Sequence, residues 1–367
     1  MGQTPIMGRS ERNAMGNRRN GTIELLRAVF CFAILLFHIS MDNFGMDWRP
    51  ESWGGVLRYG ALGVEFFFIT SGYFMAKSIQ TQDVKHDAIG VVTWKFMWRK
   101  VKTLLPYHIA FNLIAIWIGL FRGHSIVVNI NRFSCLLFLP TLGFNDGEWL
   151  LGAEWYVGYM LFAMLIIFVF YCIIGKELMM KIIAPIGAVV IYGYIAANAE
   201  ILISGNHMLR AFGGLLLGFT VYGLSVKVKS IFSRIKNEII IELIRIYPVI
   251  VILLFVVYLN TNIGTDAQPF IVLILASGLI FTFAEEGMIS HSHALNNKVI
   301  YWLGKMCLPV YLVQNITRSA AQMIFSGRSV YVVFAAELIL SILAGIVSYY
   351  CWDILKNRFN VLLRKPA

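Results

Sequence analysis

Charged side chains are scarce in this chain. Only 14% of its 367 residues are Asp, Glu, Lys or Arg, whereas an ordinary soluble domain carries about a quarter. Hydrophobic residues make up 58% of the chain, and the mean hydropathy is +0.71. This balance excludes an ordinary soluble domain. It predicts an all-α, polytopic integral membrane protein whose main surroundings are the lipid bilayer.

Cysteines at paired or metal-ligand spacings are also lacking. All five lie in apolar segments: Cys31, Cys135, Cys172, Cys307 and Cys351. We interpret them as small buried hydrophobic residues and expect no metal site. We interpret the net charge of +11 as a sign of membrane topology rather than of nucleic-acid binding. A cationic excess in a membrane protein marks its cytoplasmic loops. We therefore expect no nucleic-acid partner.

The amino end lacks the pattern of a cleavable signal peptide. It is polar and basic, and no short apolar core with a small-residue cleavage site follows it. We expect a basic tail over 1–21, a ten-helix transmembrane domain over 22–352 and a second basic tail over 353–367. The ten apolar runs that predict the spans are 22–40, 59–77, 103–121, 149–174, 182–199, 208–224, 240–259, 269–285, 300–316 and 330–352. An eleventh run, 133–144, is too short to span and predicts a re-entrant or interfacial segment.

The distribution of Lys and Arg over the predicted loops gives an orientation. If the amino end is cytoplasmic, the cytoplasmic segments hold 22 of the 31 Lys and Arg residues and the outer loops hold 7. This bias follows the rule that positive charge stays inside. Both termini are therefore expected in the cytoplasm, and the protein in the cell's inner, cytoplasmic membrane.

Arg27 and His38 are ionisable residues within the first apolar run. At about 100° per residue, the eleven steps from Arg27 to His38 return to nearly the same face of a helix. The rise along that face is about 16 Å, near half of a ~30 Å hydrocarbon core. Ionisable groups at such depth are costly, so both are candidates for function.

The second predicted span carries Glu65, Ser71 and Tyr73. Glu65 is expected at about the depth of His38, and a carboxylate there needs a polar partner. Gly63 and Gly72 favour close approach of neighbouring helices, and helix packing alone is the competing explanation for the Ser-Gly-Tyr sequence.

Arg99 and Lys102 stand three residues apart at the start of the third predicted span, so they share a helix face. Such cations either anchor the helix at the cytoplasmic surface or hold phosphate groups, and both interpretations stay open at this point. His108, just inside the same span, is a further candidate for contact with a cofactor.

Later spans add polar residues with weaker signals. Glu154 in the fourth span is expected near the outer face, where Trp155 and Tyr156 indicate an interfacial belt. The ninth span holds Lys305 toward its cytoplasmic end, and Gln314 and Asn315 toward its outer end. The two amides either take part in function or cross-link helices.

Taken together, these motifs resemble the acyltransferase 3 family of membrane-bound O-acyltransferases, which typically acetylate sugars of bacterial surface polysaccharides. The resemblance runs through spans one to three and returns near span nine. The residues that carry it are Glu24, Arg27 and His38; the stretch 63–73; Arg99, Lys102 and Pro106; and the stretch 301–312. Two positions depart from the pattern, since Gln314 stands where relatives often have His and Glu65 where Asp is common.

The resemblance implies acetyl-CoA as donor and a hydroxyl of a cell-surface or lipid-linked sugar as acceptor. We expect Arg27, Arg99 and Lys102 to hold the donor's phosphates, and Ser71 or Tyr73 to contact its thioester. The extended pantetheine arm has about the length of the rise from Arg27 to His38.

Two chemical roles for His38 stay open. In the first it is the general base that takes the proton of the sugar hydroxyl, with Glu65 orienting its ring. In the second it is a nucleophile that carries the acetyl group as an acetyl-imidazole. The alternative to an enzyme is a transporter of an anionic or sugar-linked solute, which predicts broken helices at corresponding places in two halves of the chain. A scaffold protein does not account for the intramembrane charges.

Overall fold

A computed structural model describes residues 20–45, 57–80, 89–121, 132–143, 150–198, 206–261, 265–284 and 293–363. The amino tail expected over 1–21 lies outside the described residues, apart from its last two positions. Within the expected carboxyl tail, residues 353–363 continue the last helix.

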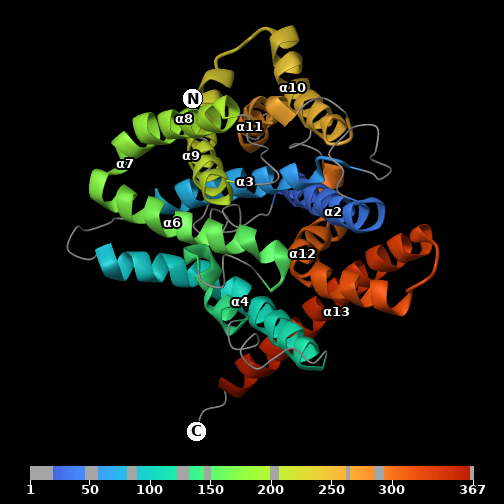
Figure 1. The fold of residues 1–367 in the computed structure, drawn as a ribbon. Coiled ribbons are helices and arrows are strands. Elements are labelled where there is room, and N and C mark those ends of the chain that lie inside the picture. The colour runs from blue at the N-terminus through green and yellow to red at the C-terminus, as the bar shows by residue number, and fades with distance from the viewer. Residues whose placement is uncertain are drawn as a thin grey trace.

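Long helices make up most of the described chain, as the all-α prediction requires (Figure 1). Ten of them in the described ranges have 14 residues or more, and each overlaps one predicted span. They are α2 (Gly21–Phe44), α3 (Gly63–Ile79), α4 (Ile89–Phe121), α6 (Trp155–Ile174), α8 (Ala184–Ala197), α9 (His207–Phe232), α10 (Glu238–Tyr258), α11 (Gln268–Phe283), α12 (Lys298–Ile324) and α13 (Val330–Leu363).

Seven helical stretches in the described part of the chain are long and apolar enough to cross a membrane: 21–44, 89–121, 152–174, 176–197, 207–232, 238–258 and 330–358. Helices α3 and α11 are shorter, with 17 and 16 residues. Helix α12 is long and continuous, but its apolar sequence is interrupted by the polar residues Lys305, Gln314 and Arg318. A multi-pass membrane protein is thus confirmed, whereas ten spans and the terminal orientation stay predictions.

Asparagine caps explain where several helices begin. The Asn20 side chain accepts a hydrogen bond from the Thr22 N–H at 2.9 Å, and Asn237 and Asn297 cap α10 and α12 in the same way. Such caps satisfy N–H groups that the first turn of a helix leaves unpaired. Gly45 ends α2 with φ at +86°, a conformation that favours glycine.

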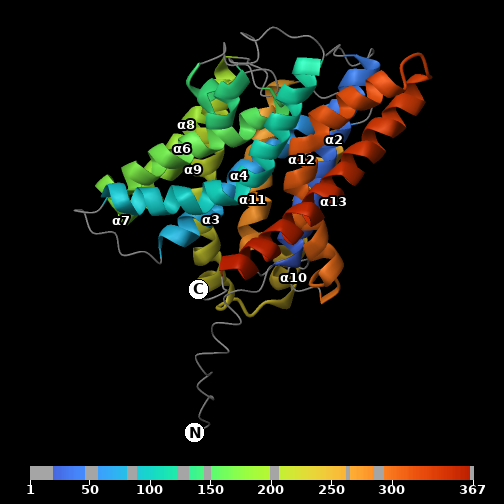
Figure 2. The ribbon, with the colours of Figure 1, turned by 90° about the horizontal axis from the view of Figure 1, so that it is seen from below.

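Helix α4 is longer than the predicted third span, because it begins at Ile89 rather than near residue 103. Pro106 lies inside it, and a proline removes one backbone hydrogen bond and bends a helix. The two halves of α4 run in different directions in both views (Figures 1 and 2). Residues 89–102, which lie before the apolar run of the predicted span, therefore form a helical arm that leads into it.

The short apolar run expected over 133–144 forms two 3-10 turns, Ser134–Leu137 and Leu139–Leu142. Phe138 joins them with φ at +56°, and Cys135 and Pro140 are buried. Neither turn is long enough to span a membrane, in agreement with the prediction.

Glycines bring α3 and α9 together at the centre of the bundle. A Cβ added to Gly72 would collide with the Leu215 carbonyl oxygen, and one added to Gly218 with the Ile69 carbonyl oxygen. The predicted role of Gly72 in close helix packing is thereby confirmed.

Helix α2 packs against α12, and the two run side by side in the same direction. Cys31 donates a hydrogen bond through Sγ to the Cys307 carbonyl at 3.4 Å, and Arg318 Nε donates one to Asp42 Oδ2 at 2.5 Å. Helix α13 returns antiparallel along α12, since Thr317 meets Ser341 and Trp302 meets Tyr350. This register places His38 level with Gln314.

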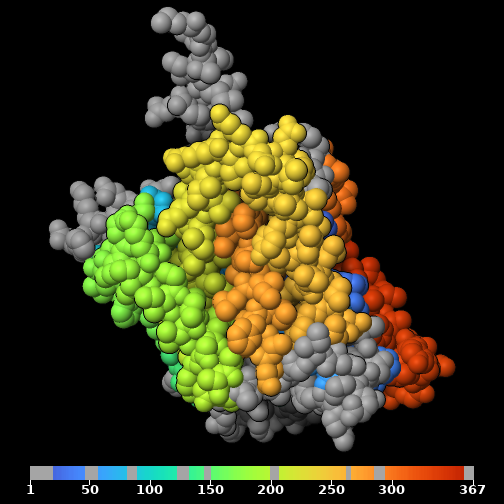
Figure 3. Space-filling view, turned by 90° about the horizontal axis from the view of Figure 1, so that it is seen from above, coloured from blue at the N-terminus to red at the C-terminus, as the bar shows by residue number. Residues whose placement is uncertain are grey.

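Helices α8, α9, α10 and α11 lie across one face of the molecule (Figure 3). Their exposed side chains include large apolar groups, among them Val190, Leu253 and Phe270. An apolar surface of this kind suits contact with lipid.

Candidate active site

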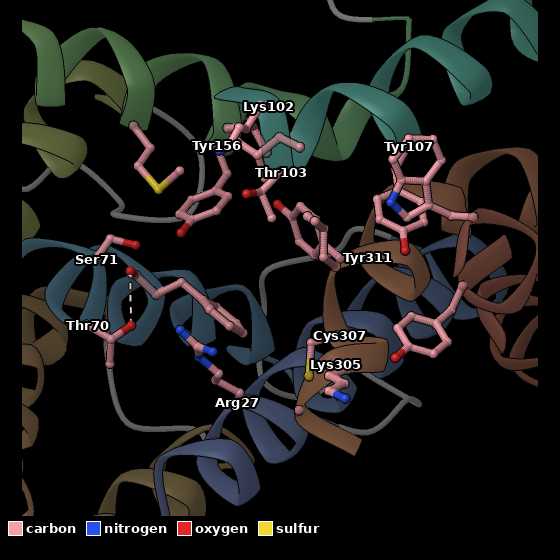
Figure 4. A pocket seen from close by; sticks show the side chains of 18 of the residues that line it. Arg27, Thr70, Ser71, Lys102, Thr103, Tyr107, Tyr156, Lys305, Cys307 and Tyr311 are labelled. Atoms are coloured by element: carbon pink, nitrogen blue, oxygen red, sulfur yellow. Dashed lines mark hydrogen bonds between the residues drawn. The ribbon is translucent and has the colours of Figure 1, made fainter. Parts of the chain in front are cut away.

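A cavity of about 890 Å³ lies among α2, α3, α4, α6, α12 and α13 (Figure 4). It is larger than a typical water-filled void and falls in the size range of sites for small molecules. Polar and aromatic side chains from six helices line it, so residues far apart in sequence meet around one space.

One end of the cavity is open and cationic, and we call it the cavity mouth. Its lining includes Arg27, Lys102, Lys305, Asp353 and Lys356. All except Arg27 are exposed, and the Arg27 side chain is 33% exposed. Four cations against one carboxylate make the mouth suited to phosphate groups.

The inner end is formed by buried and half-buried side chains: Phe67, Thr70, Ser71, Tyr156 and Tyr311. Tyr311 lies six residues beyond Lys305 on α12, about 9 Å along the helix axis. The cavity therefore leads from a charged opening to an aromatic interior with several hydroxyl groups.

Arg27 reaches the cavity from α2, as its position on the helix face predicts. Its Nη1 donates to Glu24 Oε1 at 3.5 Å, and its guanidinium lies 5.7 Å from the centre of the Phe74 ring. Figure 4 shows Arg27, Ser71 and Tyr156 pointing toward one another across the cavity. The structure thus brings together three residues from three helices.

His38 lies on the same continuous helix as Arg27, eleven residues further along. It is half-buried and is not among the described residues that line the cavity. His38 lies level with Gln314 on the neighbouring α12. Gln314 is three residues beyond Tyr311, or about 4.5 Å further along that helix. His38 therefore lies just past the inner end of the cavity.

Glu65 has two buried partners other than His38. Its Oε1 accepts a hydrogen bond from Arg210 Nε at 2.7 Å, and its Oε2 accepts one from the Tyr192 hydroxyl at 2.6 Å. Arg210 also lies over the Trp155 ring, 4.9 Å from its centre. The described contacts do not bring Glu65 to His38, so the orienting role assigned to Glu65 has no direct contact to support it.

Arg99 and Lys102 lie in different surroundings. Lys102 lines the cavity mouth, whereas Arg99 lies in a separate shallow groove beside Trp94 and Trp98. The two indole rings are stacked with centres 6.0 Å apart. The two residues lie on one helix, as their spacing predicts, but only Lys102 lines this cavity.

Ser71 and Tyr73 also separate. Ser71 lines the inner end, while Tyr73 is 6% exposed and stacks on Phe283 with ring centres 3.7 Å apart. Tyr73 packs α3 against α11, which is the helix-packing explanation of the Ser-Gly-Tyr sequence.

His108 belongs to a buried polar cluster rather than to the cavity lining. Its Nδ1 lies 2.7 Å from Glu154 Oε1, and Nε2 lies 3.2 Å from the Leu136 carbonyl. Asn112 Nδ2 donates to the same Glu154 oxygen at 2.6 Å. The cluster joins α4, the start of α6 and the 3-10 segment, and Glu154 is thus not an exposed interfacial residue.

Arg210 is the residue that sequence reasoning missed most clearly. It lies in the first turn of α9 with no exposed surface. Its place inside the apolar run 208–224 is the signal that would have marked it as an intramembrane charge.

Asp42 and Arg318 were missed as well, and they form an ion pair beyond His38. Asn315 accepts a second hydrogen bond from Arg318, at 3.2 Å. The two partners are 276 positions apart in the chain, so no local pattern pairs them.

The helices and the cavity define a multi-pass membrane protein with a polar site enclosed by its bundle. Comparison with protein families matches residues 20–354 to the acyltransferase domain of the acyltransferase 3 family. Because the match covers nearly the whole chain, the protein belongs to this family, and acyl transfer is favoured over solute transport. Comparison with curated proteins gave no match, and neither did comparison with solved structures.

Proposed function

We propose that this protein is an O-acetyltransferase. It transfers an acetyl group from cytoplasmic acetyl-CoA to a hydroxyl of a sugar in a cell-surface or lipid-linked glycan. The observation that supports this most directly is the cavity, with its cationic mouth and its hydroxyl-bearing aromatic interior close to His38. In this proposal the mouth faces the cytoplasm.

The donor's phosphates bind at the cavity mouth, where Arg27, Lys102 and Lys305 supply positive charge. The pantetheine arm then extends inward along α2 toward Tyr311. Binding energy from the distant phosphates holds the thioester in place, which lowers the entropic cost of the reaction. Arg99 joins this phosphate site only if its side chain turns from the Trp94 groove.

His38 acts as the general base in the transfer step. Its imidazole takes the proton of the sugar hydroxyl while that oxygen attacks the acetyl carbonyl carbon. The carbon–sulfur bond then breaks, and the CoA thiolate takes the proton back from the His38 imidazolium and leaves as the thiol. In this proposal Ser71 and the Tyr156 hydroxyl, which both line the cavity, donate hydrogen bonds to the developing oxyanion.

The first test of this mechanism replaces His38. We expect His38→Ala to lower acetyl transfer from labelled acetyl-CoA about 10²–10⁴-fold, the usual contribution of general acid–base catalysis. The measurement uses purified protein, with elution as a single species as the criterion for folding. His207→Phe is the matched control, because His207 stacks on Trp155 with ring centres 4.1 Å apart and a phenyl ring preserves that contact.

Full activity in the His38→Ala protein would contradict the catalytic assignment. Rapid acid quenching of a single turnover separates the two roles of the histidine. A general base leaves the label on CoA or product alone, while label recovered on His38 would replace this mechanism with an acetyl-imidazole relay.

A further inference from the structure

Helix α13 contributes more to the cavity than its sequence indicates. At 34 residues it is about 51 Å long, well over the roughly 20 residues that a span requires. Tyr349, Trp352, Asp353 and Lys356 all line the cavity from its last part. Their spacing of three, four and seven residues places them on one helical face.

The opposite side of this part of α13 is apolar and exposed. Ile354 is 56% exposed and Leu355 is 50% exposed, and neither lines the cavity. The helix is therefore two-sided here, with lipid-compatible residues outward and aromatic and charged residues toward the cavity mouth.

Tyr107 completes this surface from the other side of the cavity. It follows Pro106 at the bend of α4, is 8% exposed, and lies close enough to Tyr349 and Asp353 to interact with both electrostatically. Figure 4 shows Tyr107 on the same side of the cavity as Tyr311 and apart from Ser71. Aromatic rings from two helices and one carboxylate thus meet beside the mouth cations.

The combination of groups is specific. Cations alone are enough for phosphate, and an added carboxylate weakens such a site. A carboxylate among aromatic rings instead suits a flat, uncharged base that also carries a hydrogen-bond donor. A purine with an exocyclic amino group has both properties, because its face stacks on aromatic rings and its amino group donates to a carboxylate.

We propose that the surface formed by Tyr107, Tyr349, Trp352, Asp353 and Lys356 binds the adenine nucleotide portion of the donor. The adenine ring stacks on the aromatic side chains, of which Trp352 offers the largest face, and its amino group donates to Asp353. Lys356, one turn from Trp352, pairs with the phosphate on the ribose. This assignment rests on the proposed use of acetyl-CoA and adds the residues that recognise its nucleotide.

The test compares binding of CoA, dephospho-CoA and pantetheine to purified protein by calorimetry. We expect Trp352→Ala to weaken CoA binding about tenfold, the value of one stacked base, and Trp352→Phe to restore most of the loss. Pantetheine binding is expected to be the same in both variants and in the unchanged protein. Lys356→Gln is expected to reduce the preference for CoA over dephospho-CoA.

Ile354→Ala and Leu355→Ala are the matched controls, since they alter the outward side of the same turn. Equal binding of CoA before and after Trp352→Ala, or an equal loss for pantetheine, would overturn the proposal. Binding of CoA that depends on Trp352 without any acetyl transfer would refute the proposed function and leave the nucleotide site standing. Failure of the unchanged protein to bind CoA would refute both.

Discussion

Among single residues, Glu65 shows how tertiary partners change the meaning of an intramembrane charge. Its carboxylate is fully buried and is joined to Arg210 and Tyr192. Arg210 keeps Nη1 and Nη2 buried without a hydrogen-bond partner in the described structure. The ion pair therefore lets each charge neutralise the other, since either charge buried alone would destabilise the bundle.

We expect Glu65→Ala to destabilise the protein by about 3–5 kcal/mol, because it leaves the Arg210 charge buried and unpaired. Thermal unfolding in detergent measures the loss. The double variant Glu65→Leu with Arg210→Met is the control, and it should recover much of the stability by removing both charges. If the double variant folds normally but loses acetyl transfer, Glu65 or Arg210 has a role in catalysis as well as in packing.

For helices as elements, close packing of α3 and α9 depends on residues without side chains. The backbone of each helix occupies the space that a Cβ on the other would need at Gly72 and Gly218. Since backbone atoms cannot rotate away, an added methyl group must separate the helices. The same helices position Ser71 at the cavity and Arg210 beside Glu65.

Gly72→Ala is accordingly expected to destabilise the protein by about 1–3 kcal/mol, as overpacking does elsewhere. Gly193→Ala is the control, because a Cβ at this helical position meets no atom within 4 Å. The alanine at 193 should be neutral or slightly stabilising through its higher helix propensity. Equal melting temperatures for the two variants would contradict the packing described here.

At the scale of the whole molecule, the cavity mouth and the predicted cytoplasmic charges lie at the same end of the bundle. Arg27 and Lys305 lie near the starts of two parallel helices, and Lys356 near the end of the antiparallel α13. The turn between α12 and α13, with Arg328, lies at the other end. The loop-charge bias therefore predicts that the mouth faces the cytoplasm.

This orientation predicts how the two ends react with reagents that cannot cross a membrane. In a background without native cysteines, Lys305→Cys should react with an impermeant maleimide in inverted vesicles and not in right-side-out vesicles. Arg328→Cys should show the reverse pattern, since its exposed side chain lies in the turn at the opposite end. The reverse result for both positions would invert the predicted topology.

Parts of the site followed from the sequence because they depend on one helix at a time. The eleven-residue spacing of Arg27 and His38 fixes them on one face whatever the rest of the chain does. Composition alone predicted membrane-spanning helices. These are local properties, set by helical geometry and backbone chemistry within a few turns.

The partners across helices were decided only by the tertiary structure. Lys102 faces the cavity, whereas Arg99 lies in the groove beside Trp94 and Trp98. Glu65 pairs with Arg210, which is 145 positions away in the chain, and the last part of α13 lines the cavity mouth beside Tyr107. Packing of this kind is the sum of many weak contacts between segments that are distant in the sequence. The sequence by itself therefore determined the membrane helices and their polar faces. Only the folded bundle decided which of those faces share a cavity.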